Sequence, residues 1–118
     1  MEVNVPFITF EQYQQSTKTT AIYPDAGKQG SLQSLSYCAL GLAGEAGEIA
    51  NKVKKLLRDG DSFSKRDAIA AELGDVLWYL SQLATELEKD LGKIAQANLD
   101  KLSDRKKRGV IGGSGDNR

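Results

Sequence analysis

Two long segments of the chain repeat apolar residues at steps of three, four and seven, and this spacing limits the fold more than any other feature. Residues spaced in this way lie along one side of an α-helix, whereas a half-buried β-strand alternates at every second position. The first segment carries Leu35, Leu42, Ile49 and Leu56, widened by Leu32, Ala39, Val53 and Leu57. The second carries Ile69, Leu73, Val76, Leu80, Leu83 and Leu87. We therefore predict two long amphipathic helices.

Capping residues set the expected ends of these two helices. Ser31 is suited to cap the first helix, and the glycine stop at Gly60 ends it. Ser64 is suited to cap the second, where Asp67 would complement the helix dipole. We expect the second helix to run to about Lys89. In an antiparallel hairpin of these helices, their apolar stripes would face each other.

Shorter helices are expected on either side of the long pair. Thr9, followed three positions later by Gln12, is a capping-box pattern for a short helix that fades near Thr20. A turn follows at residues 23–27. After a break or kink at Gly92, a fourth helix is expected on Ile94, Ala97, Leu99 and Leu102, ending by Gly109.

The length of 118 residues and the absence of strand-like alternation predict one all-α domain over residues 1–118. We expect a four-helix-bundle-like arrangement of antiparallel helices, with an extended arm at residues 1–8 and a glycine-rich tail at residues 110–118. The sequence shows neither the apolar core of a signal peptide nor a run of 18 apolar residues. The single cysteine fits a reducing compartment, so we expect a cytoplasmic protein.

The sequence contains no histidine, and this excludes several kinds of site. Ser-His-Asp and Cys-His catalysis, zinc sites with histidine ligands and the Glu-x-x-His di-iron bundle all need that residue. Any metal must therefore be held by oxygen ligands, which favours magnesium, manganese or calcium. The net charge of zero argues against a partner that is a nucleic-acid polymer.

A short internal repeat brings acidic residues into the apolar stripes. Residues 42–49 match residues 69–76 at a shift of 27 positions. The first acid of each copy occupies a core-facing position, and the second flanks the stripe three residues later. Ionised carboxylates in a helical interior cost several kcal/mol unless they are compensated, and facing carboxylates repel each other. A divalent cation resolves both problems, and Mg²⁺, with Mn²⁺ as a substitute, suits oxygen ligands. The candidate ligands are Glu45, Glu48, Glu72 and Asp75.

Basic, polar and aromatic residues at helical spacing from these acids are candidates for binding a phosphorylated substrate. Tyr79 follows Asp75 by four positions and is suited to contact a base or sugar, whereas Trp78 is expected to point into the core or an interface. Gly41, Gly44 and Gly47 would allow a close approach by a helix or a phosphate. The candidate phosphate contacts are Lys52, Lys55, Lys101 and Arg105, with Asn98 as a polar contact. Solvated lysines and plain aromatic packing are the alternative interpretation.

The acidic motifs also resemble those of a known family. Residues 41–49 and 72–80 are similar to the MazG-like all-α nucleoside triphosphate pyrophosphohydrolases, whose pattern is Glu-x-x-Glu, a gap, then Glu-x-x-Asp. The run Ala97–Arg105 and the segment from Arg108 to Asp116 resemble the C-terminal part of single-domain members. Full-length MazG proteins hold two such domains in tandem, and this sequence carries one.

The resemblance implies a helical bundle that forms a homodimer, or a dimer of dimers, around the active site. It implies Mg²⁺-dependent hydrolysis of a nucleoside triphosphate, often a deoxynucleotide, to the monophosphate and pyrophosphate. The four motif carboxylates would be both the catalytic and the metal-binding residues. Such an enzyme would serve to clear the nucleotide pool.

Other interpretations stay open. An all-α enzyme of the same architecture would act on another substrate, such as dUTP or phosphoribosyl-ATP. A non-enzymatic helical dimerisation or binding module would leave Glu45 and Glu72 exposed or neutralised by lysines. A calcium sensor is disfavoured because the sequence holds no EF-hand loop.

Overall fold

The computed structural model of the protein describes residues 7–117, and every regular element in that range is helical. The elements are α1 (Phe10–Thr17), the 3-10 helix η1 (Lys18–Thr20), α2 (Leu32–Asp59), α3 (Phe63–Glu86) and α4 (Leu91–Lys107). The predicted all-α class is confirmed. The predicted arm lies mostly outside the described residues, and residues 108–117 of the tail contain turns and no helix. No described helix combines the length and the apolar character needed to cross a membrane.

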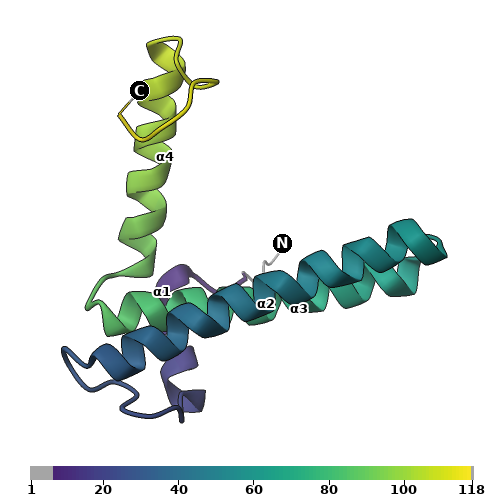
Figure 1. Ribbon diagram of the computed structural model, residues 1–118. Coiled ribbons are helices and arrows are strands. Elements are labelled where there is room, and N and C mark those ends of the chain that lie inside the picture. The colour runs from purple at the N-terminus through teal and green to yellow at the C-terminus, as the bar shows by residue number, and fades with distance from the viewer. Residues whose placement is uncertain (1–6, 118) are drawn as a thin grey trace, which may run out of the picture.

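The two long helices form an antiparallel hairpin, and they lie side by side along their length (Figure 1). Residues 60–62 connect them at one end, which we call the turn end. At the opposite, open end, the Ser34 hydroxyl donates to the Glu86 carboxylate at 2.9 Å. Nearer the turn, the Lys52 ammonium lies 3.8 Å from a Glu72 oxygen. These contacts fix which residues of the two helices face each other.

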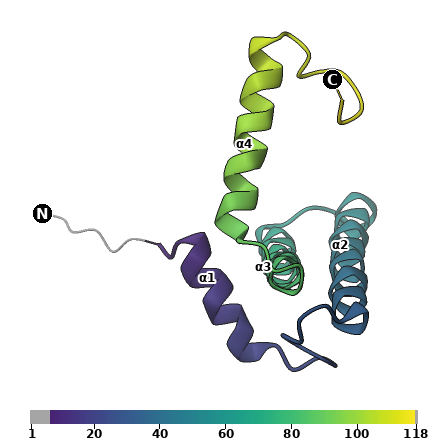
Figure 2. The same ribbon diagram turned by 90° about the vertical axis from the view of Figure 1, so that its left-hand side faces the viewer.

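The other two helices meet this hairpin between its open end and its middle. α1 packs against α3 and α4, and α4 projects away from the hairpin in both views (Figures 1 and 2). The radius of gyration is 17.4 Å, whereas a compact chain of this length would have roughly 13.5 Å. One chain therefore does not close into a four-helix bundle, and the bundle stays a prediction for an assembly of chains.

The most buried side chains are gathered at the open end, and most of them are polar. They are Gln14, Thr17, Tyr23, Ser34, Cys38, Ser81, Gln82, Ala84, Glu86, Leu91 and Arg105. Apart from Arg105, they come from α1, the loop that follows it, the start of α2, the end of α3 and the start of α4. Among the described residues, none between positions 39 and 80 is buried.

A hydrogen-bonded network around Glu86 holds the open end together. Its carboxylate accepts hydrogen bonds from the Tyr23 hydroxyl, the Gly27 N–H at 2.8 Å and the Ser34 hydroxyl at 2.9 Å. The Gln82 amide donates to the same tyrosine oxygen at 2.9 Å. A buried carboxylate is costly unless donors satisfy it, and here three do. The loop before α2 is thus tied to the last turns of α3.

The apolar stripes are covered less completely than the spacing predicts. Leu35, Leu42, Ile49 and Leu56 of α2 and Ile69, Val76 and Leu83 of α3 are half-buried, as expected for the seam of a helix pair. The flanking residues Leu32, Ala39, Val53 and Leu57 of α2 and Leu73, Leu80 and Leu87 of α3 are exposed. Phe63, at the turn, is 91% exposed. The hairpin therefore keeps apolar edges uncovered within one chain.

Several helix ends follow the sequence signals. The capping box of Thr9 and Gln12 is present, and Ser31 caps α2, which ends before Gly60. The cap of α3 was assigned wrongly to Ser64: the hydroxyl of Ser62 accepts the capping hydrogen bond from the Lys65 N–H. Either serine has the chemistry of a cap, so composition alone does not choose between them.

The junction between α3 and α4 also differs from the prediction. α3 ends at Glu86 because Glu88 adopts a left-handed conformation with φ of 58°, and the Lys89 N–H then donates to the Ala84 carbonyl at 2.8 Å. This is a helix-ending motif that glycine usually provides. α4 begins at Leu91, capped by Asp90, so Gly92 lies inside the helix and is not the break.

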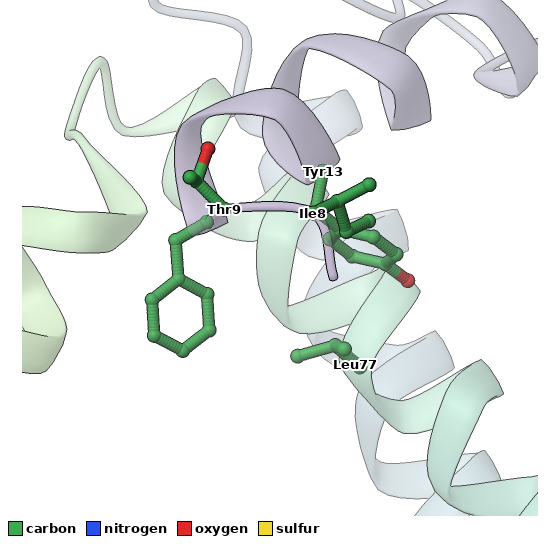
Figure 3. Close-up of a pocket in the computed structure, with 5 residues that line it drawn as sticks. Ile8, Thr9, Tyr13 and Leu77 are labelled. Carbon is green, nitrogen blue, oxygen red and sulfur yellow. The ribbon is translucent and has the colours of Figure 1, made fainter. Parts of the chain in front are cut away.

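A small apolar hollow of about 170 Å³ lies where the start of α1 meets α3 (Figure 3). It is lined by Ile8, Thr9, Phe10, Tyr13 and Leu77. Its position shows that α1 lies against the same helix that carries the second acidic motif.

Candidate metal centre

Three of the four predicted ligands meet in the middle of the hairpin. Each of Glu45, Glu72 and Asp75 offers a carboxylate oxygen, and these oxygens all lie within 4.8 Å of one another. Glu45 comes from α2, and the other two come from α3. The two glutamates are half-buried and Asp75 is exposed, so the group opens toward solvent on one side. The predicted convergence of the two acidic motifs is therefore present within one chain.

Antiparallel pairing explains why these residues meet. Glu72 and Asp75 are three positions apart on α3 and project from neighbouring turns of one face. Glu45 occupies the facing turn of α2, since Gly41 lies beneath Tyr79 one turn closer to the open end. The fourth predicted ligand, Glu48, is exposed and does not belong to the group of three oxygens.

The carboxylates of this cluster repel one another, and one of their oxygens lacks a hydrogen-bond partner. Glu72 Oε2 is buried and has no hydrogen-bond partner, and no other buried side-chain oxygen or nitrogen among the described residues shares that condition. Interaction with the Glu72 carboxyl raises the pKa of Glu45, and burial and the negative charge of Asp75 act in the same direction. Crowded carboxylates favour a bound proton or a bound cation.

A single lysine compensates this charge only in part. The Lys52 ammonium lies 3.8 Å from Glu72 Oε1, and it does not reach the unpaired Oε2. Three carboxylates with one nearby ammonium match the ligand set of a hard divalent cation, which takes carboxylate oxygens and retains water. The residues present therefore fit a magnesium-type ion held by Glu45, Glu72 and Asp75.

An aromatic hollow borders the carboxylates on the side of the open end. It measures about 330 Å³ and is lined by Thr20, Glu45, Asp75, Trp78 and Tyr79. Tyr79 was expected on this side. Trp78 was expected to point away from the acids, and this is wrong, because it lines the same hollow, where its Nε1–H donates to the Thr20 hydroxyl at 2.8 Å. Its ring makes T-shaped contacts with Tyr79 at 5.1 Å and with the buried Tyr23 at 6.2 Å, so its expected packing against the core is present. Trp78 follows Asp75 by three positions, and this spacing is the signal that would have placed it here.

The position of the Tyr79 ring in this hollow requires a glycine at position 41. A Cβ at that position would lie 2.2 Å from the ring of Tyr79, so no other residue leaves the ring where it is. A Cβ at Gly44 or Gly47 would meet no atom within 4 Å. The predicted close approach is therefore present at Gly41 and is not used within one chain at the other two.

The remaining predicted substrate contacts are dispersed. Lys55 is exposed on α2, near the turn end. Asn98 and Lys101 are exposed on α4, which projects away from the hairpin, so one chain does not bring them to the carboxylates (Figure 2). Arg105 is buried beneath the tail, where its guanidinium donates to the Asp116 carbonyl at 3.0 Å.

Comparison with known proteins connects this geometry to a family. A family model described as the MazG nucleotide pyrophosphohydrolase domain matches residues 33–110, which include both acidic motifs and all of α4. The Gene 37 protein of Mycobacterium phage L5 is 58% identical over 109 residues, covering 90% of this chain and 96% of the phage protein. No solved structure gives a significant match.

Proposed function

Because this chain belongs to the MazG nucleotide pyrophosphohydrolase family, we propose that it hydrolyses nucleoside triphosphates, deoxynucleotides among them, to the monophosphate and pyrophosphate. The observation that carries this proposal is the group of carboxylates around the buried, unpaired Glu72 Oε2. Such a group is unfavourable by itself and becomes favourable when it binds a cation that also binds phosphate oxygens.

The reaction follows from the chemistry of these residues. The oxygen of a water molecule forms a bond to the α-phosphorus, the bond from that phosphorus to the α–β bridging oxygen breaks, and pyrophosphate leaves with that oxygen. Glu45, Glu72 and Asp75, joined by Glu48, would hold Mg²⁺, or Mn²⁺ in its place, which neutralises the charge on the phosphate oxygens. One of these carboxylates orients the water and accepts its proton.

A second copy of the chain would complete the site. The apolar edges of the hairpin are uncovered, and Leu57 and Phe63 are 85% and 91% exposed. Burying such surface favours association, and a homodimer or a dimer of dimers would bring the basic face of one α4 near the carboxylates of another chain. Asn98 and Lys101 would then contact phosphates across the interface, and Arg105 would join them only after the tail that covers it moves.

Light scattering tests this assembly. We expect the native protein to be a dimer or a tetramer, and Phe63→Glu to shift it toward the monomer. A native protein that is monomeric at micromolar concentrations would contradict the proposed assembly.

Product analysis tests the activity. Each common NTP and dNTP, together with dUTP and phosphoribosyl-ATP, is incubated with the protein and Mg²⁺, and the products are separated. We expect a monophosphate and pyrophosphate in equal amounts, and a loss of at least about 100-fold in rate for Glu72→Gln. Glu11→Gln, an exposed substitution on α1, is the matched control and should retain the native rate.

The panel also separates the alternatives. Preference for dUTP or phosphoribosyl-ATP would identify a relative with another substrate. Absence of turnover on every nucleotide, together with no stabilisation by Mg²⁺, would support a non-enzymatic helical module. Native-rate turnover by Glu72→Gln would contradict the assignment of the site.

A further inference from the structure

A second hollow borders the carboxylates, on the side of the turn end. It measures about 230 Å³ and is lined by Lys52, Lys55, Asp59, Lys65 and Ala68. We call it the lysine hollow. Only Lys52 and Lys55 stood out in the sequence, although Lys65 on α3 precedes Glu72 by seven positions, the same spacing that separates Lys52 from Glu45.

The charge of the lysine hollow is positive despite the presence of Asp59. The Arg58 guanidinium donates to both oxygens of that carboxylate, at 2.8 and 2.7 Å, and this pairing lowers the pKa of Asp59, with smaller contributions from Lys65 and Lys55. Asp59 is therefore already compensated. Lys55 and Lys65 remain, together with Lys52, whose ammonium is shared with Glu72 at 3.8 Å, and these groups favour an anion.

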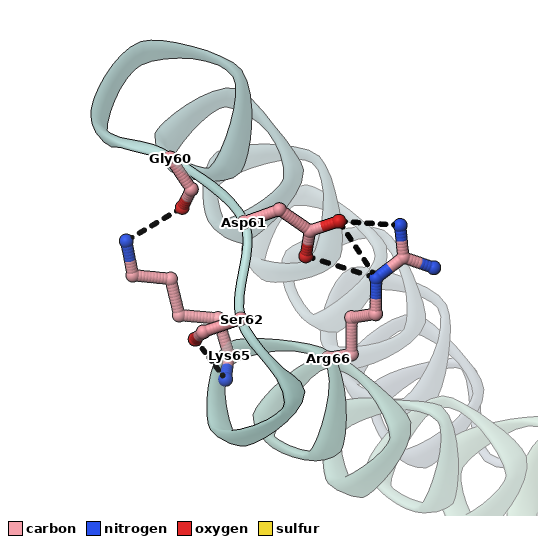
Figure 4. Close-up of polar contacts among 5 residues, drawn as sticks. All are labelled: Gly60, Asp61, Ser62, Lys65 and Arg66. Carbon is pink, nitrogen blue, oxygen red and sulfur yellow. Dashed lines mark hydrogen bonds and ion pairs between the residues drawn. The ribbon is translucent and has the colours of Figure 1, made fainter.

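Lys65 is positioned by the turn and keeps donors for a ligand. Its ammonium donates to the Gly60 carbonyl at 2.7 Å (Figure 4). An ammonium has three N–H donors, so this contact orients the side chain and occupies one of them. The neighbouring Arg66 is held differently, by the Asp61 carboxylate at 2.6 Å, and it does not line the lysine hollow.

The two hollows lie on opposite sides of the carboxylates along the hairpin, and we call this arrangement the row. The aromatic hollow includes Glu45 and Asp75 in its lining, and Lys52 of the lysine hollow lies 3.8 Å from Glu72. The helical rise of 1.5 Å per residue separates Glu45 and Lys52 by about 10 Å along α2. The order from the open end to the turn end is therefore aromatic, acidic and basic.

We infer that this row sets the direction in which a nucleoside triphosphate lies on the hairpin, with its base at Trp78 and Tyr79 and its departing pyrophosphate on Lys52, Lys55 and Lys65. This inference rests on the proposed function, which puts the α-phosphorus at the carboxylates. Only two directions are then available. Aromatic rings stack on a base, and ammonium groups neutralise the charge that develops on pyrophosphate. The opposite direction would put a tetravalent anion against two aromatic rings.

Binding of the two products to the full chain in Mg²⁺ tests this direction without needing turnover. Calorimetry measures inorganic pyrophosphate and each deoxynucleoside monophosphate separately. Lys65→Gln should weaken pyrophosphate roughly tenfold and leave the monophosphates unchanged. Arg66→Gln, which removes one positive charge from the same turn outside the lysine hollow, should change neither.

The single tryptophan supplies the reciprocal measurement. Trp78 is the chain's one tryptophan, so a stacked base should quench its fluorescence, whereas pyrophosphate should not. Trp78→Leu should weaken the monophosphates roughly tenfold and spare pyrophosphate. If Trp78→Leu does not fold, pyrophosphate binding by Lys65→Gln still tests the direction of binding.

The outcomes distinguish a wrong direction of binding from a wrong proposed activity. Pyrophosphate affinity that is unaffected by Lys65→Gln, or quenching of Trp78 by pyrophosphate, would overturn the direction of binding even in an active enzyme. Lys65-dependent pyrophosphate binding and monophosphate quenching of Trp78, without hydrolysis of any nucleotide, would support the direction and contradict the proposed activity.

Discussion

The open end and the middle of the hairpin differ in how a buried carboxylate oxygen is satisfied. At the open end, a buried carboxylate, Glu86, is surrounded by three donors. In the half toward the turn, the buried oxygen of another carboxylate, Glu72 Oε2, has no donor at all. The same residue type is thus structural where Glu86 is buried and unsatisfied where Glu72 is half-buried with one buried oxygen. A satisfied carboxylate stabilises the chain, whereas an unsatisfied one implies a ligand.

The largest effect should come from removing the satisfied carboxylate. Glu86→Ala leaves the Tyr23 hydroxyl, the Gly27 N–H and the Ser34 hydroxyl without their acceptor, and we expect it to lower the free energy of unfolding by about 3 kcal/mol or more. Glu48→Ala, which removes an exposed carboxylate, should change it by less than about 0.5 kcal/mol. Denaturant unfolding measures the free energy of unfolding of both variants. Equal losses would contradict the structural role of Glu86.

Bound Mg²⁺ should stabilise the part of the hairpin that holds the unpaired Glu72 oxygen. At a concentration of 100 times its dissociation constant, a ligand that binds only the folded state stabilises it by about 2.7 kcal/mol. We expect a rise of this order for the native protein in thermal melts and none for Glu72→Gln. In metal-free buffer the same variant should be as stable as the native chain or more so, because it removes an uncompensated buried charge.

Two glycines of α2 offer a smaller and sharper comparison. Gly41→Ala places a methyl group against the Tyr79 ring and should destabilise the protein by roughly 1–3 kcal/mol. Gly44→Ala meets open space within one chain and should stabilise α2 by up to about 1 kcal/mol. A loss of stability for Gly44→Ala, measured by denaturant unfolding, would indicate that a second chain packs closely at that position.

Alkaline pH should lower the stability of the open end through titratable groups that each have a modest effect. Burial raises the pKa of the Cys38 thiol above 9.0, and burial is likewise the main cause of the raised pKa of Tyr23. A raised folded-state pKa contributes stability below the unfolded value, and this contribution is lost as the pH rises through the folded value. Stability should therefore fall from about pH 9 upward. Cys38→Ala should flatten that slope in a series of melts, and an unchanged slope would exclude the thiol as its cause.

The sequence predicted the elements that regular spacing encodes. The steps of three, four and seven located both long helices, and the acidic repeat at a shift of 27 brought Glu45, Glu72 and Asp75 together as expected. The helices depend on local helical geometry, which spacing determines, and the meeting of the carboxylates depends in addition on the antiparallel pairing of α2 and α3. The exposure of Glu48 depends on how the helices rotate against each other, and spacing fixes that only coarsely.

The parts that sequence reasoning missed depend on contacts between distant segments. The network of Tyr23, Gln82 and Glu86 joins residues about sixty positions apart, and the polar residues of α3 interrupt a stripe that was read as apolar. Glu88 ends α3 in a conformation for which glycine would have been the visible signal. Lys65 gains its role only because the turn folds it back beside α2.

The complete burial of Cys38 has a practical consequence for following motion in this molecule. Its side chain is 0% exposed in the described chain, and it is the one thiol in the sequence. A thiol-specific reagent can reach it only when the packing around the start of α2, which includes Tyr23, opens. The rate at which the native protein is alkylated therefore counts openings of that end, with no label or engineered cysteine added.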